Sequence, residues 1–167
     1  MEKERKITNI LAFLYGIILI WIILFKMQFS MENLHGIRNI NLVPFGESVI
    51  INGKIDFDEI IDNVIIFIPA GLYIQMLKTN WKIGAKIGMI AGVSFLFEIL
   101  QYILAIGASD ITDIITNTFG GILGLGIYQV FYKILKSDEK TNRVLNVLGS
   151  IGTILMILFL LLLIMMN

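Results

Sequence analysis

The 167-residue chain contains no cysteine, two prolines and a single histidine. Without cysteine it forms no disulfide, no thiolate nucleophile and no cysteine-based metal site. His35 is the only histidine, so the chain lacks the second histidine of a His-Glu-x-x-His zinc motif. His35 also falls in a predicted loop, so it cannot serve in a Ser-His-Asp triad within the helical bundle. We interpret His35 as a surface residue and assign no metal ligand; the sequence does not identify a cofactor.

Charge is also scarce, because only 16% of the residues are charged whereas 57% are hydrophobic, and the net charge is zero. A neutral chain of this kind argues against nucleic acid as a partner, and the composition predicts an integral membrane protein whose partner is the lipid bilayer. Apolar runs of about 20 residues are long enough to cross a hydrocarbon layer of ~30 Å. Such runs begin near Ile7, Ile60, Ile83, Ile111 and Val144. We therefore predict an all-α integral membrane bundle of about five transmembrane helices.

The apolar runs suggest three parts: an N-terminal transmembrane anchor at 1–26, a membrane domain at 27–136 and a C-terminal transmembrane helix at 137–167. The first run is longer than a signal-peptide core and is followed by no small-residue cleavage site, so we expect it to stay uncleaved. Pro44 disfavours helix around 41–45, although the neighbouring isoleucines favour an apolar surface. We expect the loop before the second span to be interfacial or re-entrant; a solvated loop is the alternative.

Most basic residues fall on one side of the five predicted spans. Placing the N-terminus in the cytoplasm leaves only Lys26, Arg38 and Lys54 outside. The residues then inside are Lys3, Arg5, Lys6, Lys78, Lys82, Lys86, Lys133, Lys136, Lys140 and Arg143. The positive-inside rule therefore predicts a multi-pass membrane protein with a cytoplasmic N-terminus, an extracytoplasmic C-terminus, and outer loops near 27–58 and 105–110.

Polar side chains interrupt the third and fourth spans near their predicted outer ends. At about 100° per residue, Asp110, Asp113 and Asn117 share one face of the fourth span, which continues into glycine. Glu98 and Gln101, three residues apart, are neighbours on the third span. Charged side chains within membrane helices usually face protein or water and carry function. We therefore expect these two polar faces to meet.

Glycine spacing suggests how the two spans would meet. Gly84, Gly88 and Gly92 recur every four residues on the third span, and Gly120 and Gly124 do so on the fourth. Small residues at this spacing allow close approach of membrane helices. We therefore predict that the third and fourth spans pack closely through their glycines.

The acidic residues of the fourth span have more than one interpretation. Asp110 and Asp113 resemble a helix start whose carboxylates bind free backbone amides. Capping does not account for Asn117 or Glu98, and the oxygens together could hold a hard cation, share a proton or bind a polar head group. The ligand-binding residues that we predict are Asn41, Asn63, Glu98, Gln101, Asp110, Asp113 and Asn117.

These motifs, in this order, resemble the VanZ-like family of bacterial membrane proteins over residues 41–126. The motifs that carry the resemblance are Asn41-Leu42-Val43-Pro44-Phe45, Asn63 with Phe67-Ile68-Pro69-Ala70-Gly71, Ser94 with Glu98 and Gln101, and Ser109-Asp110-Ile111-Thr112-Asp113 with Asn117 and Gly120. The resemblance implies a small helical membrane domain associated with resistance to the glycopeptide teicoplanin, with no agreed reaction. Many members have an arginine shortly before the first aspartate, where this chain has Gly107.

Three hypotheses of function follow. The first is an outward-facing polar pocket that binds a lipid-linked envelope ligand or a lipoglycopeptide, with apolar walls for an acyl chain. The second is a membrane-embedded enzyme acting on a lipid head group, with Glu98 and Asp113 as acid and base or as metal ligands. The third is a polar cluster that serves folding only.

Overall fold

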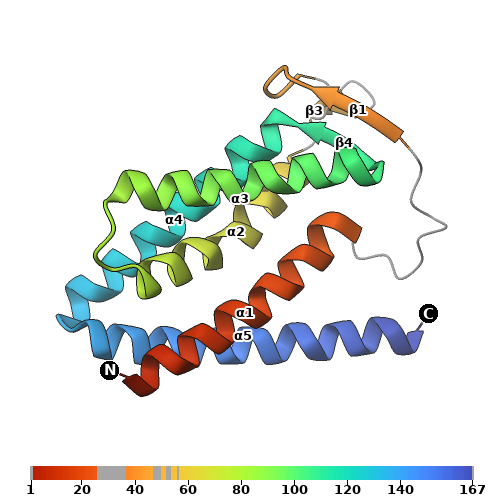
Figure 1. Ribbon diagram of the computed structural model, residues 1–167. Helices are drawn as coiled ribbons and strands as arrows, with labels where there is room; N and C mark the ends of the chain where they lie inside the picture. Colours follow the sequence, from red (N-terminus) through yellow and green to blue (C-terminus); the bar gives the residue numbers. More distant parts are fainter. Residues whose placement is uncertain (1, 26–36, 47–49, 52–53, 56, 167) are drawn as a thin grey trace.

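The structure is a computed structural model that describes residues 2–25, 37–46, 50–51, 54–55 and 57–166, so His35 lies outside the described residues. Five helices are long and apolar enough to cross a membrane. They are α1 (Glu2–Phe25), α2 (Asp58–Leu77), α3 (Ile83–Leu104), α4 (Ile111–Leu135) and α5 (Asp138–Met166). The predicted all-α membrane bundle is confirmed. The two ends of the chain lie at opposite ends of the bundle, as an odd number of crossings requires (Figure 1).

Helices α2 and α4 make the closest helix contact in the bundle. A β-carbon at Gly120 would fall on the Val64 carbonyl, and one at Gly124 on the Ile68 carbonyl. The prediction that the glycines of α3 make the close contact is wrong. At Gly84, Gly88 and Gly92 a β-carbon would meet no other atom of the described structure within 4 Å. Four-residue spacing marks a face on which backbones can approach, but it does not identify the neighbouring helix.

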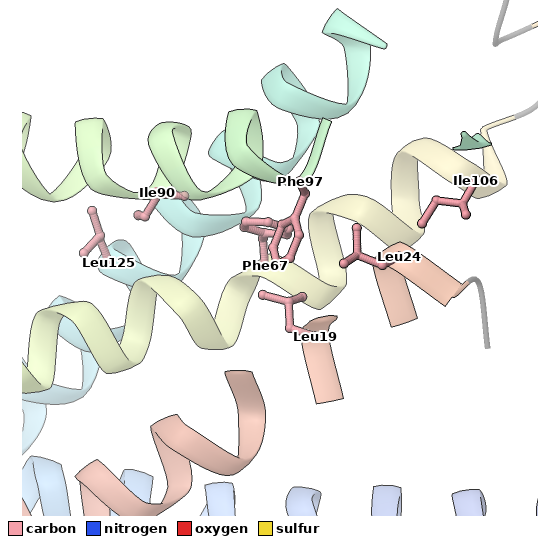
Figure 2. Packing of buried hydrophobic residues seen from close by; sticks show 7 residues of the cluster. All are labelled: Leu19, Leu24, Phe67, Ile90, Phe97, Ile106 and Leu125. Carbon is pink, nitrogen blue, oxygen red and sulfur yellow. The ribbon is translucent and has the colours of Figure 1, made fainter. Parts of the chain in front are cut away.

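The main apolar cluster lies where α1, α3 and α4 surround α2. Phe67, in the middle of α2, is fully buried and faces Phe97 of α3, with Leu19 of α1 beneath them (Figure 2). The other buried members of the cluster are Leu24, Ile90, Ile106 and Leu125. Because lipid is as apolar as these side chains, dispersion contacts and shape fit hold the cluster together more than the hydrophobic effect does.

A short parallel strand pair closes one end of the bundle, beside the C-terminal end of α3 (Figure 1). Strand β1 (Ile37–Asn41) pairs with β4 (Ile106–Asp110), in a register that places Ile37 opposite Ile106 and Asn41 opposite Asp110. Two short antiparallel strands of two residues each, β2 (Ile50–Ile51) and β3 (Lys54–Ile55), follow. The sequence analysis predicted a loop near 105–110 between α3 and α4, and most of this segment forms β4 instead. The strands satisfy backbone groups that an irregular loop would leave unpaired in a membrane.

A polar cluster joins α1 to α5 near the N-terminal end of the chain. Thr8 Oγ1 donates to Asn146 Oδ1 at 2.9 Å, and Asn146 Nδ2 donates to the Glu4 carboxylate at 3.1 Å. Arg143 forms an ion pair with the same carboxylate at 3.4 Å. Together with the packing of Leu145 against Leu11, Tyr73 and Tyr128, these bonds attach α5 to the bundle.

Candidate functional site

Asp110 lies at the junction of β4 and α4 and makes hydrogen bonds on two sides. Its Oδ1 accepts from the Thr112 backbone N–H at 2.7 Å, so it is the N-cap of α4. Its Oδ2 accepts from Asn41 Nδ2 at 3.0 Å, because the strand register places these two residues side by side. The capping interpretation therefore holds for Asp110, but capping uses only part of its carboxylate.

Glu98 reaches the same junction from α3. Its Oε2 accepts from the Asp110 backbone N–H at 2.8 Å, and its own backbone carbonyl accepts from Ser109 Oγ at 2.7 Å. The side chains of Glu98 and Asp110 are both more than nine-tenths buried. The structure thus brings Glu98 of the third span to Asp110 at the start of the fourth, through the backbone of strand β4.

Asp113 and Asn117 continue the polar face of α4 into the bundle. Asn63 Nδ2 of α2 donates to Asp113 Oδ1 at 2.8 Å. Asn117 Nδ2 donates to Ser94 Oγ of α3 at 2.9 Å, and Asn117 Oδ1 is buried without a hydrogen-bond partner among the described residues. The amides and acids of three spans therefore converge on α4.

Gln101 is buried in a different contact from the other predicted site residues. Its Nε2 donates to the Ile23 carbonyl of α1 at 3.2 Å, so this amide links α3 to α1. A spacing of three residues places Gln101 near Glu98 on the helix surface. Three residues rotate the chain by about 300°, so the two side chains point about 60° apart and can contact different neighbours.

The turn after β1 is tied to the start of α4 by a residue that the sequence analysis did not select. Gly46 N–H donates to the Val43 carbonyl at 3.1 Å, with Pro44 and Phe45 at the two central positions. Phe45 has a positive φ of 56°, a strained value for a bulky residue. Thr112 Oγ1 accepts from the Phe45 backbone N–H at 3.1 Å. Pro44 predicted only that this segment would not be helical, and nothing in the local sequence indicated the bond between Phe45 and Thr112.

A pocket of about 280 Å³ opens beside these polar residues, between α3, α4 and β1. Four polar residues border it, namely Asn41, Glu98, Ser109 and Asp110, but its accessible surface is apolar. The other lining residues are apolar or aromatic: Ile40, Leu42, Phe95, Ile99, Tyr102, Ile111 and Ile114. Asn63, Asp113 and Asn117 do not line the pocket; Asn63 bonds to Asp113, and Asn117 bonds to Ser94.

The surface that the pocket offers to a ligand is apolar. The carboxylates of Glu98 and Asp110 are buried next to it and accept hydrogen bonds from the protein. The described residues contain no group of three or more histidine, cysteine or acidic side chains arranged to hold a metal ion. The arrangement suits an apolar chain that lies beside a group of buried polar side chains.

Comparisons with known proteins agree with the resemblance seen in the motifs. The family model described as VanZ/LLP1 matches residues 12–132, from within α1 to the last turn of α4. A curated relative, Protein VanZ of Enterococcus faecium, is 46% identical over 138 residues, covering 79% of each chain. No solved structure matches the chain. On the strength of the family model and of this relative, the chain belongs to the VanZ/LLP1 family.

Proposed function

We propose that the pocket between α3, α4 and β1 binds a cell-envelope ligand at the outer face of the membrane, either a lipid-linked precursor or a lipoglycopeptide. The observation that carries the proposal is the combination of buried carboxylates and apolar walls in one pocket. An acyl chain fits the apolar walls, and the polar head group then lies at the end of the pocket that Asn41 and Ser109 border. Through this binding the protein contributes to glycopeptide resistance, as the family resemblance implies.

The outward orientation is part of the proposal. The turns between α2 and α3 and between α4 and α5 lie at the same end as the N-terminus, and the strand pair lies at the other (Figure 1). The lysine-rich segments belong to the first of these ends. By the positive-inside rule that end is cytoplasmic, so the pocket faces the envelope.

The network around α4 also supports folding, and the test must separate the two roles. We would express the chain in a susceptible bacterium together with Glu98→Gln and Asp113→Asn, with Asp62→Asn as the matched control because Asp62 is exposed on α2. We expect the unaltered chain and the control to raise the inhibitory concentration of teicoplanin. Glu98→Gln, at the pocket, and Asp113→Asn, in the polar network next to it, should lose this effect at unchanged membrane levels.

The proposal fails if the unaltered chain has no effect on susceptibility, or if Glu98→Gln and Asp113→Asn both keep full resistance and ligand binding. A loss of resistance that parallels a loss of folded protein in the membrane would instead assign the cluster to folding.

A further inference from the structure

A second and larger cavity, of about 420 Å³, lies between α1, α2, α4 and α5. This volume falls within the range of ~300–1,000 Å³ for pockets that take a small ligand. Gly149 and Gly152 of α5 both line the cavity, and at Gly152 a β-carbon would meet no described atom within 4 Å. The surface of the cavity is almost entirely apolar, so its occupant must be mostly hydrocarbon.

The cavity extends through about half of the membrane. Helix α2 has 20 residues, which at 1.5 Å each match the ~30 Å thickness of a hydrocarbon layer. Among the α2 residues that line the cavity, Met76 lies one residue and Ile65 twelve residues before Leu77, where the helix ends. Twelve residues correspond to about 18 Å. The cavity therefore runs from one edge of the hydrocarbon layer to its middle, on the side of the α2–α3 turn.

The exposed part of the lining faces lipid. Met76 and Leu145 are the lining residues of α2 and α5 closest to the helix ends on that side, and each is only 6% exposed. Deeper in the membrane, Ile65 is 56% and Leu148 51% exposed. An empty cavity would forfeit the dispersion contacts of its walls, and lipid chains are the molecules that meet its exposed side.

One buried polar group points into this apolar space. Tyr73 of α2 lines the cavity and is 8% exposed, and its hydroxyl oxygen lies 2.8 Å from where a β-carbon of Gly149 would be, on the wall formed by α5. Within the described residues this hydroxyl makes no hydrogen bond. The neighbouring Tyr15 hydroxyl, in contrast, donates to the Ile66 carbonyl at 2.6 Å. Because a buried donor without a partner is costly, an occupant that offers Tyr73 an acceptor is favoured.

The depth of Tyr73 indicates which acceptor this is. Tyr73 lies four residues, about 6 Å, before the end of α2, close to the level at which ester groups join the chains of a lipid to its head group. An ester carbonyl accepts hydrogen bonds and donates none, and the chain attached to it extends toward the middle of the bilayer, as the cavity does. A lipid of this leaflet thus supplies the oxygen and the hydrocarbon at matching depths.

From these observations we propose that the cavity between α1, α2, α4 and α5 binds one acyl chain of an ester-linked membrane lipid, and that the Tyr73 hydroxyl donates to the ester carbonyl. The bound chain fills the space between α2 and α5, so it helps to hold α5 against the helices that the family match covers. The site lies toward the opposite end of the bundle from the strand pair, and it is independent of the proposed function.

The test uses the full chain in nanodiscs of phosphatidylglycerol, with a small fraction of the same lipid carrying a photoreactive diazirine in one chain. After illumination, mass spectrometry locates the adducts. We expect more adducts on Ile65 and Gly152, which line the cavity, than on Ile154, which is 57% exposed on α5 outside it.

Two glycine variants distinguish the cavity from general lipid contact. Gly152→Leu places a side chain in the cavity and should abolish the enrichment on Ile65. Gly126→Leu is the matched control and should preserve it, because a β-carbon at Gly126 also meets no described atom within 4 Å and Gly126 does not line the cavity. Thermal unfolding in the same nanodiscs verifies that both variants are folded.

The role of the Tyr73 hydroxyl is tested with a second probe, in which an ether replaces the ester of the labelled chain. Without the carbonyl, this probe should give about fivefold fewer adducts in the cavity, as expected for the loss of one hydrogen bond. Tyr73→Phe should remove the difference between the two probes. Tyr132→Phe should keep it, because Tyr132 is 39% exposed on α4 and does not line the cavity.

Adducts spread evenly over the exposed residues of α5, or unchanged labelling of Ile65 in folded Gly152→Leu, would overturn the acyl-chain site. Equal labelling by the ester and ether probes, or a difference that persists in Tyr73→Phe, would overturn the contact between Tyr73 and an ester. Drug susceptibility is not a readout of this site, so these outcomes leave the proposed function to its own test.

Discussion

At the scale of single residues, Asp110 carries the largest number of separate roles. It caps α4, bonds to Asn41 across the strand pair, receives Glu98 at its backbone N–H and lines the pocket. The sequence analysis identified the cap from residue type and position. It did not predict the bond to Asn41, because that bond depends on a strand register between segments 69 residues apart.

Replacement of Asp110 by alanine should therefore destabilise the protein more than loss of an ordinary cap. Removal of the N-cap costs about 1 kcal/mol, and leaving the buried Asn41 amide without its acceptor adds about 1–3 kcal/mol. Asp110→Asn should cost less, because an asparagine oxygen can still cap the helix. Thermal unfolding in detergent would measure whether Asp110→Ala lowers the stability of the protein more than Asp110→Asn does.

The matched control for that series is Asp62→Ala, since Asp62 is exposed. We expect it to stay within about 0.5 kcal/mol of the unaltered protein. Equal destabilisation by Asp62→Ala and Asp110→Ala would show that the bonds of Asp110 contribute nothing specific.

At the scale of elements, the helices were predictable and their partners were not. Apolar runs located all five spans because a bilayer requires helices of a set length. The strands β1 and β4 escaped prediction because each has only five residues and the pairing is nonlocal. The acids of the site were predictable from the cost of charge in a membrane. The pocket walls were not, because Phe95 and Ile99 look like any other lipid-facing residues.

The glycine contacts give a prediction at this scale. Gly124→Ala places a β-carbon on the Ile68 carbonyl of α2, so the helices must move apart. Such overpacking typically costs about 1–3 kcal/mol. Gly88→Ala meets no neighbouring atom within 4 Å in the described structure, and it should stabilise the protein by up to ~1 kcal/mol through helix propensity.

The comparison of these two variants by thermal unfolding tests the assignment of the α2–α4 interface. If Gly88→Ala destabilises the protein and Gly124→Ala does not, the close contact belongs to α3, as the sequence spacing first suggested.

At the scale of the whole molecule, α5 differs from the other helices in lying outside the family match. The family match ends at residue 132, before α5 begins. The division into 1–26, 27–136 and 137–167 remains a prediction, although the match already begins at residue 12, within α1. The polar cluster of Glu4, Thr8 and Asn146 attaches α5 to α1 at the end of the molecule opposite the strand pair (Figure 1).

Asn146→Ala removes the hydrogen bonds that this side chain makes to Thr8 and Glu4. We expect a loss of about 1–3 kcal/mol in the free energy of unfolding, with ligand binding at the distant pocket unchanged. Ser150→Ala is the control, because Ser150 Oγ bonds only within α5 to the Asn146 carbonyl. If Asn146→Ala folds fully but no longer binds ligand, the polar cluster of α1 and α5 and the distant pocket are not independent.

The central claim is an envelope-facing pocket that binds a ligand, and cysteine labelling tests it most directly, because the chain has no cysteine of its own. Leu42 lines the pocket and is exposed, so Leu42→Cys provides a single reactive thiol there. In intact cells, a membrane-impermeant maleimide should label Leu42→Cys, and saturating teicoplanin should slow the labelling. Asn80→Cys, in the turn between α2 and α3, should react only after permeabilisation. Labelling of Leu42→Cys only in permeabilised cells, or at a rate unaffected by teicoplanin, would contradict the account.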